Sequence, residues 1–204
     1  MTEIPHLVVD HHLELLLDYS HFILHGGEGA EDAELTLLDA AFAHGPSAGD
    51  GHTVVVISPQ QTAFDMPIRI QVWDQRPADD GNWQQVSEAR LRIGEHGLTI
   101  SSPVDGWAQA PVPPGDYLAE IAGTDFAKHG EPGDHWRIRL WPDDGASLRP
   151  PRIWEAPESD TSTNTPPLVL GTVLDPAALP QSRQEPTITI PFPGDVGGTW
   201  GVQR

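Results

Sequence analysis

The sequence contains no cysteine, which excludes disulfides, thiolate nucleophiles and metal sites that need thiolate ligands. It also lacks any apolar run of about eighteen residues, so no transmembrane helix is expected. Its first residues, MTEIPHLVVDHH, carry neither the basic region nor the long apolar region of a signal peptide. Together these absences predict a cytoplasmic protein without a membrane partner.

Positive charge is scarce and unevenly placed. The chain has 11 Lys and Arg residues against 30 Asp and Glu residues, a formal net charge of −19, and no lysine or arginine precedes Arg69. A surface of this sign repels nucleic acid and anionic lipid, and it speeds encounter with a basic protein. The alternative is that the charge only keeps the protein in solution.

Sequence motifs for catalysis or cofactor binding are missing. The chain has no HExxH, no GxSxG and no phosphate-binding loop. The paired carboxylates Asp79-Asp80 and Asp143-Asp144 stand beside glycine or proline, as turn residues do. The ten histidines form only loose clusters, namely His11-His12, His21 with His25, and His129 with Asp134 and His135. We therefore expect no catalytic residue, no metal site and no cofactor.

Glycine and proline, with 20 and 21 residues, are too frequent for a helical bundle. Apolar and polar residues instead alternate in short runs between turn signals, as in a β-sandwich of about seven or more strands. Pro113-Pro114-Gly115-Asp116 is a turn expected to form the hairpin that joins the two halves of the sandwich. The expected strands are Leu13–Leu24, Thr53–Ile57, Met66–Asp74, Trp83–Ile93, Leu98–Ser101, an edge segment within Val104–Ala110, the residues from Tyr117 to Thr124, and Trp136–Trp141. A short helix over Leu13–Asp18 is the alternative for the start of the first strand, but Tyr19, Phe22 and Ile23 favour the strand.

One short helix is predicted over Glu31–His44, where Leu35, Leu38 and Phe42 share a face and acidic residues occupy the first turn. After residue 142 the composition becomes rich in proline, serine and threonine. The predicted class is therefore mainly β: an antiparallel sandwich domain over 1–142 with one helix, followed by a proline-rich extension over 143–204.

Two tryptophans have an ambiguous position. Trp73 and Trp141 fall on the faces of their strands opposite the aliphatic residues. They form either an exposed binding face, as in a carbohydrate- or peptide-binding module, or a second core covered by the extension.

The order of these segments resembles the competence protein J family, small acidic β-sandwich inhibitors of a DNA-uptake nuclease. The resemblance is diffuse, covers about residues 13–142 and includes no catalytic motif. It lies in Asp18-Tyr19-Ser20-His21-Phe22, the alanine-rich helix, Val86–Arg92, Glu95-His96-Gly97-Leu98-Thr99-Ile100, Pro113-Pro114-Gly115-Asp116-Tyr117 and Arg137-Ile138-Arg139-Leu140-Trp141-Pro142.

This resemblance implies a non-enzymatic protein that inhibits a toxin or nuclease, in the manner of an immunity protein. The charge agrees, because a nuclease needs a cationic surface that an acidic protein can occupy. Three alternatives stay open: a carbohydrate- or peptide-binding module, a metal-dependent enzyme, and a structural component of a larger assembly. The predicted contact residues for a basic protein partner are Glu28, Glu31, Asp32, Glu34, Asp39, Asp50, Trp73, Asp79 and Asp80.

Overall fold

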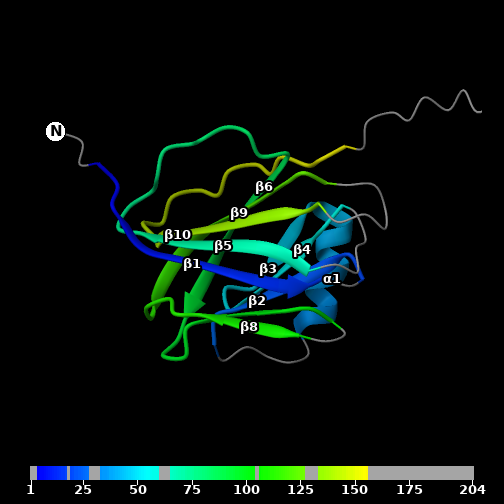
Figure 1. Ribbon diagram of the computed structural model, residues 1–204, viewed down its shortest axis with the longest axis horizontal. Helices are drawn as coiled ribbons and strands as arrows, with labels where there is room; N and C mark the ends of the chain where they lie inside the picture. The colour runs from blue at the N-terminus through cyan, green and yellow to red at the C-terminus, as the bar shows by residue number, and fades with distance from the viewer. Residues whose placement is uncertain are drawn as a thin grey trace, which may run out of the picture. The chain divides into compact units, whose positions relative to one another are not determined.

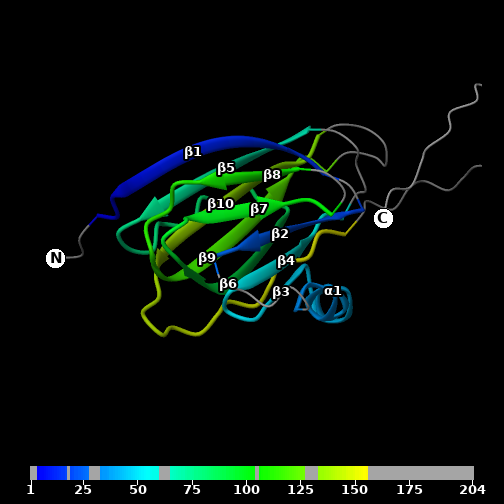
Figure 2. The ribbon, with the colours of Figure 1, turned by 90° about the horizontal axis from the view of Figure 1, so that it is seen from below.

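A computed structural model describes residues 4–17, 19–27, 33–59, 65–103, 106–126 and 133–155. Two five-stranded sheets face each other, as the sequence predicted (Figures 1 and 2). Sheet A has the order β1 (Leu7–Leu16), β5 (Asp65–Trp73), β10 (His135–Pro142), β9 (Gly115–Thr124), β6 (Gln85–Ile93). Sheet B has the order β3 (Ser47–Gly49), β4 (Thr53–Ile57), β2 (His21–His25), β7 (Leu98–Ser101), β8 (Trp107–Ala110).

The core lies between the sheets and follows the period of two that defines a strand. In β10, Ile138 and Leu140 point inward and are fully buried, and they meet Phe22 and Leu24 from β2 in one continuous cluster. The alternation predicted for β5, β6 and β10 is confirmed. All strand pairs are antiparallel except β5 with β10, which run parallel and make the sheet mixed.

The expected single strand over Leu13–Leu24 is wrong. β1 ends at Leu16 in sheet A and β2 begins at His21 in sheet B. Between them Tyr19 and Ser20 both adopt left-handed backbone conformations, with φ of 54° and 59°. Such residues reverse the chain direction, so the apolar run is divided between two layers instead of forming one two-sided strand.

Helix α1 (Ala33–His44) is present, and of the three residues of its predicted apolar face only Leu38 packs against sheet B. Leu35 and Phe42 are 75% and 63% exposed, whereas Leu37 and Ala41 are buried. The helix packs on the outer face of sheet B, where its inner side meets Ile23 and Val55 (Figure 2). The small side chain of Ala41 lets the helix lie close to the strands, and this orientation turns Leu35 and Phe42 outward.

The Pro113–Asp116 turn does connect the two sheets, since it leads from β8 in sheet B into β9 in sheet A. It is not a hairpin, because β8 and β9 do not pair. The Tyr117 hydroxyl donates a 2.9 Å hydrogen bond to the Pro113 carbonyl and fixes the corner. Burial raises the pKa of this hydroxyl.

The first compact unit of the chain is Met1–Pro157. Residues 143–155 run beside β6, where the Arg152 and Val86 backbones exchange hydrogen bonds of 2.8 and 3.0 Å. The rest of the expected proline-rich extension lies outside the described residues. No helix in the described part of the chain is long and apolar enough to cross a membrane.

Candidate partner-binding surfaces

The outer face of sheet A carries a row of buried charges. Arg137 and Arg139 alternate with the inward aliphatic residues of β10, and Glu120 lies opposite Arg139 on β9. All three are 6% exposed or less. Arg139 Nε donates to Glu120 Oε1 at 2.8 Å, and an Arg137 nitrogen lies 3.3 Å from the same oxygen. Both arginines of β10 are thus paired with a carboxylate of the same sheet.

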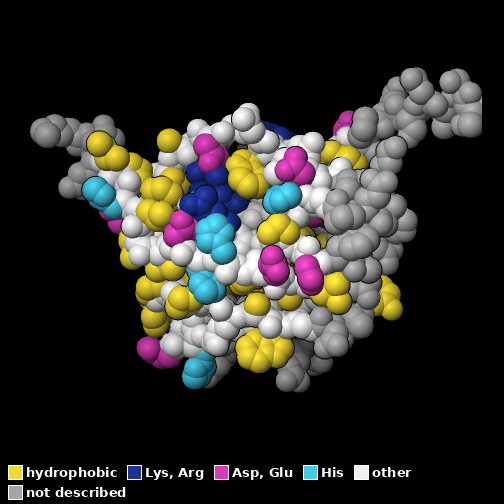
Figure 3. All heavy atoms as spheres, viewed as in Figure 1, with side chains coloured by type: hydrophobic (Ala, Val, Ile, Leu, Met, Phe, Trp, Pro, Cys, Tyr) yellow, Lys and Arg dark blue, Asp and Glu magenta, His cyan; other side chains and the backbone are white. Residues whose placement is uncertain are grey.

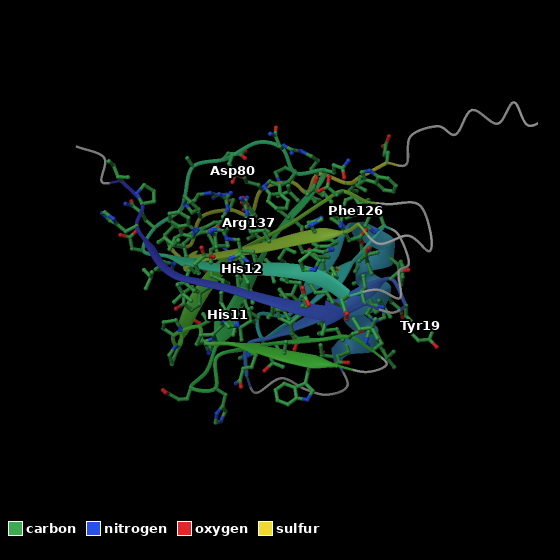
Figure 4. The ribbon with its side chains drawn as sticks, in the orientation of Figure 1. His11, His12, Tyr19, Asp80, Phe126 and Arg137 are labelled. Atoms are coloured by element: carbon green, nitrogen blue, oxygen red, sulfur yellow. The ribbon has the colours of Figure 1, made fainter. Side chains whose placement is uncertain are left out.

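The β5–β6 loop, residues 74–84, covers this row (Figures 1 and 4). Asp80 binds Arg137 through both carboxylate oxygens, one of them 2.8 Å from Nη2. The Ala78 carbonyl accepts a 2.9 Å hydrogen bond from Arg139, and the Trp83 ring lies 4.3 Å from the Arg137 guanidinium. A bidentate carboxylate and an aromatic face both suit the planar guanidinium, so the loop is held closely to the sheet.

The strap, residues 143–155, covers the neighbouring β6 edge. Asp143 accepts a 2.9 Å hydrogen bond from Arg90, and the Arg149 amide donates to Glu88 at 2.9 Å. Glu88 also pairs with Arg76 from the β5–β6 loop. A pocket of about 140 Å³ between strap and sheet is lined by Glu88 and Glu120, so it belongs to the same charge network.

The tryptophan face of sheet A is therefore covered. Trp141 is 2% exposed and lies 4.9 Å from the Arg76 guanidinium, and Trp73 is half-buried. The cover over Trp141 comes from the β5–β6 loop, whereas the sequence had suggested the extension as the cover. The carbohydrate- or peptide-binding alternative relied on these two side chains, and this burial weighs against it.

Asp80 has a structural partner. The hydrogen bonds from Arg137 lower the pKa of Asp80 to about 2, against the opposing effect of burial. Asp79, next to it, is exposed and accepts a 3.1 Å hydrogen bond from the Gly81 amide, as a turn aspartate does.

Every described arginine is engaged within the chain. Arg152 donates to the Trp83 carbonyl at 2.8 Å, and each of the others forms an ion pair with a carboxylate. Figure 3 shows arginine side chains gathered beside carboxylates on this face. The ion pairs not described above are Arg69 with Asp10, Arg92 with Asp116, and the Arg149 guanidinium with Glu88. We call sheet A with its loop and strap the neutralised layer.

Sheet B and α1 form a second layer. No lysine or arginine occurs in α1 or in any strand of sheet B. Asp39 is exposed and has no ion-pair partner among the described residues. Glu34 faces only His25, at 3.4 Å. We call this the acidic layer.

Asp50 lies between β3 and β4, where β3 approaches β6. Burial acts to raise the pKa of Asp50, but the His52 and Thr53 amides, each at 2.8 Å, donate to its carboxylate and lower it overall. Its carboxylate therefore remains ionised and shapes the turn.

The predicted contact residues do not form one surface. Glu34 and Asp39 lie on α1, outside sheet B, whereas Trp73, Asp79 and Asp80 belong to the outer side of sheet A. The core separates these two groups. Glu28, Glu31 and Asp32 lie outside the described residues, and partner binding by any of the nine stays a prediction.

The sequence prediction missed the exposure of Leu35 and Phe42. A signal for it exists, because α1 has apolar residues on more sides than one buried stripe requires. Leu37 and Ala41 are buried against the sheet, and Ala33 and Leu38 are partly buried beside them.

Three of the described histidines, His12, His25 and His135, each lie near one carboxylate. His12 lies 3.6 Å from Asp10, and His135 lies 3.4 Å from Asp125. In the described part of the chain no group of three His, Asp or Glu side chains is placed to hold a metal ion. Figure 4 shows His11 and His12 on β1, apart from Tyr19 at the far end of the view.

Comparison with known proteins gives a fold resemblance and nothing closer. No protein-family model and no curated protein sequence matches the chain. The structure is similar to ComJ from Bacillus subtilis, an inhibitor of the DNA-degrading activity of NucA, with a TM-score of 0.49 and 13% identity over 69% of this chain and 100% of ComJ. It is also similar to the product of crocagin biosynthetic gene J, with a TM-score of 0.43 and 14% identity over 67% of this chain and 99% of that one. The diffuse resemblance to the competence protein J family is thereby confirmed.

Proposed function

We propose that this protein is a non-enzymatic inhibitor that binds a basic nuclease or toxin through its acidic layer. One observation carries the proposal: the described arginines are all engaged in or beside sheet A, so the two carboxylates of α1, Glu34 and Asp39, have no arginine partner among the described residues. An incoming cationic surface can therefore pair with these two carboxylates without displacing an internal arginine.

A nuclease must carry a cationic surface, because it binds a phosphate backbone. An acidic protein that covers this surface excludes the substrate, and the opposite charges speed the encounter. ComJ inhibits a DNA-degrading nuclease, and we propose a role of the same kind here without assigning the same target.

An inhibition assay tests this proposal. Basic nucleases and toxins encoded beside the gene are purified, and their activity is measured with increasing amounts of this protein. We expect stoichiometric inhibition of at least one of them, with an association rate that falls steeply as salt is raised. If none is inhibited or bound at low salt, the proposed function is wrong.

A further inference from the structure

The outer side of α1 presents an apolar stripe that nothing in the described chain covers. Leu35, Asp39 and Phe42 stand at i, i+4 and i+7, so they follow one another along one side of the helix. Leu35 is 75% and Phe42 63% exposed, and Asp39 between them is also exposed. Two large apolar side chains are thus displayed about 10 Å apart with a free carboxylate between them.

We propose that this stripe is the anchor of the partner interface: Leu35 and Phe42 enter an apolar socket on the partner, and lysine or arginine at the rim of the socket meets Asp39 and Glu34. This inference rests on the proposed function and adds to it the location and chemistry of the contact. Apolar side chains at the centre of an interface, ringed by polar contacts, carry most of the binding energy in many complexes.

The helix is suited to this role because its other side is fixed. Leu37 and Ala41 are buried against Ile23 and Val55 of sheet B. At its end the Gly45 amide donates a 3.1 Å hydrogen bond to the Ala41 carbonyl, and Gly45-Pro46 ends the helix. A stripe on a rigid helix loses little conformational entropy on binding.

The charge favours a basic partner over a second copy of this chain. In a two-fold dimer through α1, Asp39 and Glu34 would face their own copies in a layer without cations, and like charges at an interface oppose association. A partner with cations around an apolar socket satisfies both the carboxylates and the exposed apolar side chains.

Alanine variants test the anchor against matched controls. The double variant Leu35→Ala/Phe42→Ala is compared with Val8→Ala and Ile153→Ala, whose side chains are 60% and 57% exposed outside the acidic layer. Affinity for the nuclease that the protein inhibits is measured by calorimetry, and thermal melting checks that each variant is folded. We expect the double variant to bind at least about 30-fold more weakly and the controls to bind within about twofold of the wild type.

A second probe separates the failure of this inference from the failure of the proposed function. The isotope-labelled full chain is titrated with a synthetic amphipathic peptide of lysine and leucine, and amide shifts are followed by NMR. Shifts centred on α1 support the anchor, even if no nuclease is inhibited and the proposed function falls. If a nuclease binds with equal affinity to the wild type and the double variant, or if the peptide leaves α1 unshifted, the anchor is wrong.

Discussion

The two layers of the sandwich differ in whether their charged side chains have partners within the protein. On sheet A, arginines and carboxylates are packed against each other beneath a loop and a strap, and Arg139 and Glu120 are both about 95% buried. On the helix side, carboxylates stand in solvent without cations, beside exposed Leu35 and Phe42. A high density of charged residues therefore does not by itself mark a binding surface, because in the neutralised layer the charges hold the fold together.

This difference in charge pairing follows from how much of the outer face of each sheet is covered by other parts of the chain. Sheet A has a second covering layer, so its outward polar residues lose water and need partners. Sheet B is covered by one short helix that buries Leu37 and Ala41 and partly buries Ala33 and Leu38, so Leu35 and Phe42 on its outer side stay exposed. The changes below test this contrast.

The largest effect is expected from breaking the buried network. Glu120→Gln removes the charge at nearly constant volume and leaves Arg139 without its carboxylate in a dry site. Loss of one partner of a buried pair costs about 3 kcal/mol or more of the free energy of unfolding, measured by urea denaturation. Glu95→Gln, at an exposed turn residue between β6 and β7, is the control and should change little. A loss below about 1 kcal/mol for Glu120→Gln would show that the network contributes little to stability.

Charge reversal on the acidic layer should affect binding instead of stability. Glu34→Lys/Asp39→Lys is expected to slow association with a cationic nuclease by about tenfold or more. Neither carboxylate has an arginine partner among the described residues, so both are available to attract the cations of the nuclease. Stopped-flow measurements at low salt and in 1 M salt, where screening is nearly complete (a Debye length of about 3 Å), check this.

The matched control is Asp65→Lys/Asp144→Lys, which reverses two exposed carboxylates of the neutralised layer. Equal slowing by both double variants would mean that net charge alone drives association and that the acidic layer has no special role.

A smaller effect is expected at Asp80, which holds the covering loop. Its pKa of about 2 lies below the ordinary value of 3.8, so the carboxylate stabilises the fold above pH 4, and this contribution is lost as the pH falls from about 4 to 2. Because the side chain is 52% exposed, solvent screening reduces the effect to about 1 kcal/mol.

Urea denaturation between pH 5 and pH 2 measures this contribution. Asp80→Asn should be less stable near pH 5 and should depend less on pH in the acid range. Asp79→Asn, one residue away and without an arginine partner in the described chain, should behave as the wild type. Identical pH profiles for Asp80→Asn and the wild type would contradict the assigned role.

The smallest effect is expected where the neutralised layer reaches solvent. Arg92 and Asp116 form an ion pair of 2.7 Å in which both side chains are more than 60% exposed. Exposed pairs of this kind add little to stability. Arg92→Gln should leave the unfolding midpoint unchanged, whereas Arg139→Gln should lower it clearly; similar shifts in both would remove the distinction between buried and exposed charges.

The strands could be predicted from the sequence because apolar residues that face the core, such as Ile138 and Leu140, alternate with outward-facing residues along each strand. The order of the strands was not readable, since the parallel pairing of β5 with β10 depends on contacts far apart in the chain. The division of Leu13–Leu24 depends on Tyr19 and Ser20, which both adopt a left-handed backbone conformation that is uncommon for residues other than glycine, asparagine and aspartate.

The candidate binding surface could be predicted only in part from the sequence. Net charge and the absence of cations before Arg69 indicated an acidic region, and Glu34 and Asp39 do lie in the acidic layer. Which aspartates had internal partners, as Asp80 does, required the packing of the β5–β6 loop. The exposure of Phe42 required the orientation of α1 on sheet B, which helical periodicity leaves undetermined when apolar residues surround the helix.

Hydrogen exchange of the complex with an inhibited nuclease tests the central claim most directly. Amide protection is compared between the free and the bound protein along the whole chain. If the acidic layer is the contact surface, protection increases over α1 and the neighbouring β3–β4 connection, while β10 and the β5–β6 loop exchange as in the free protein. Increased protection confined to sheet A, its loop and its strap would contradict the claim.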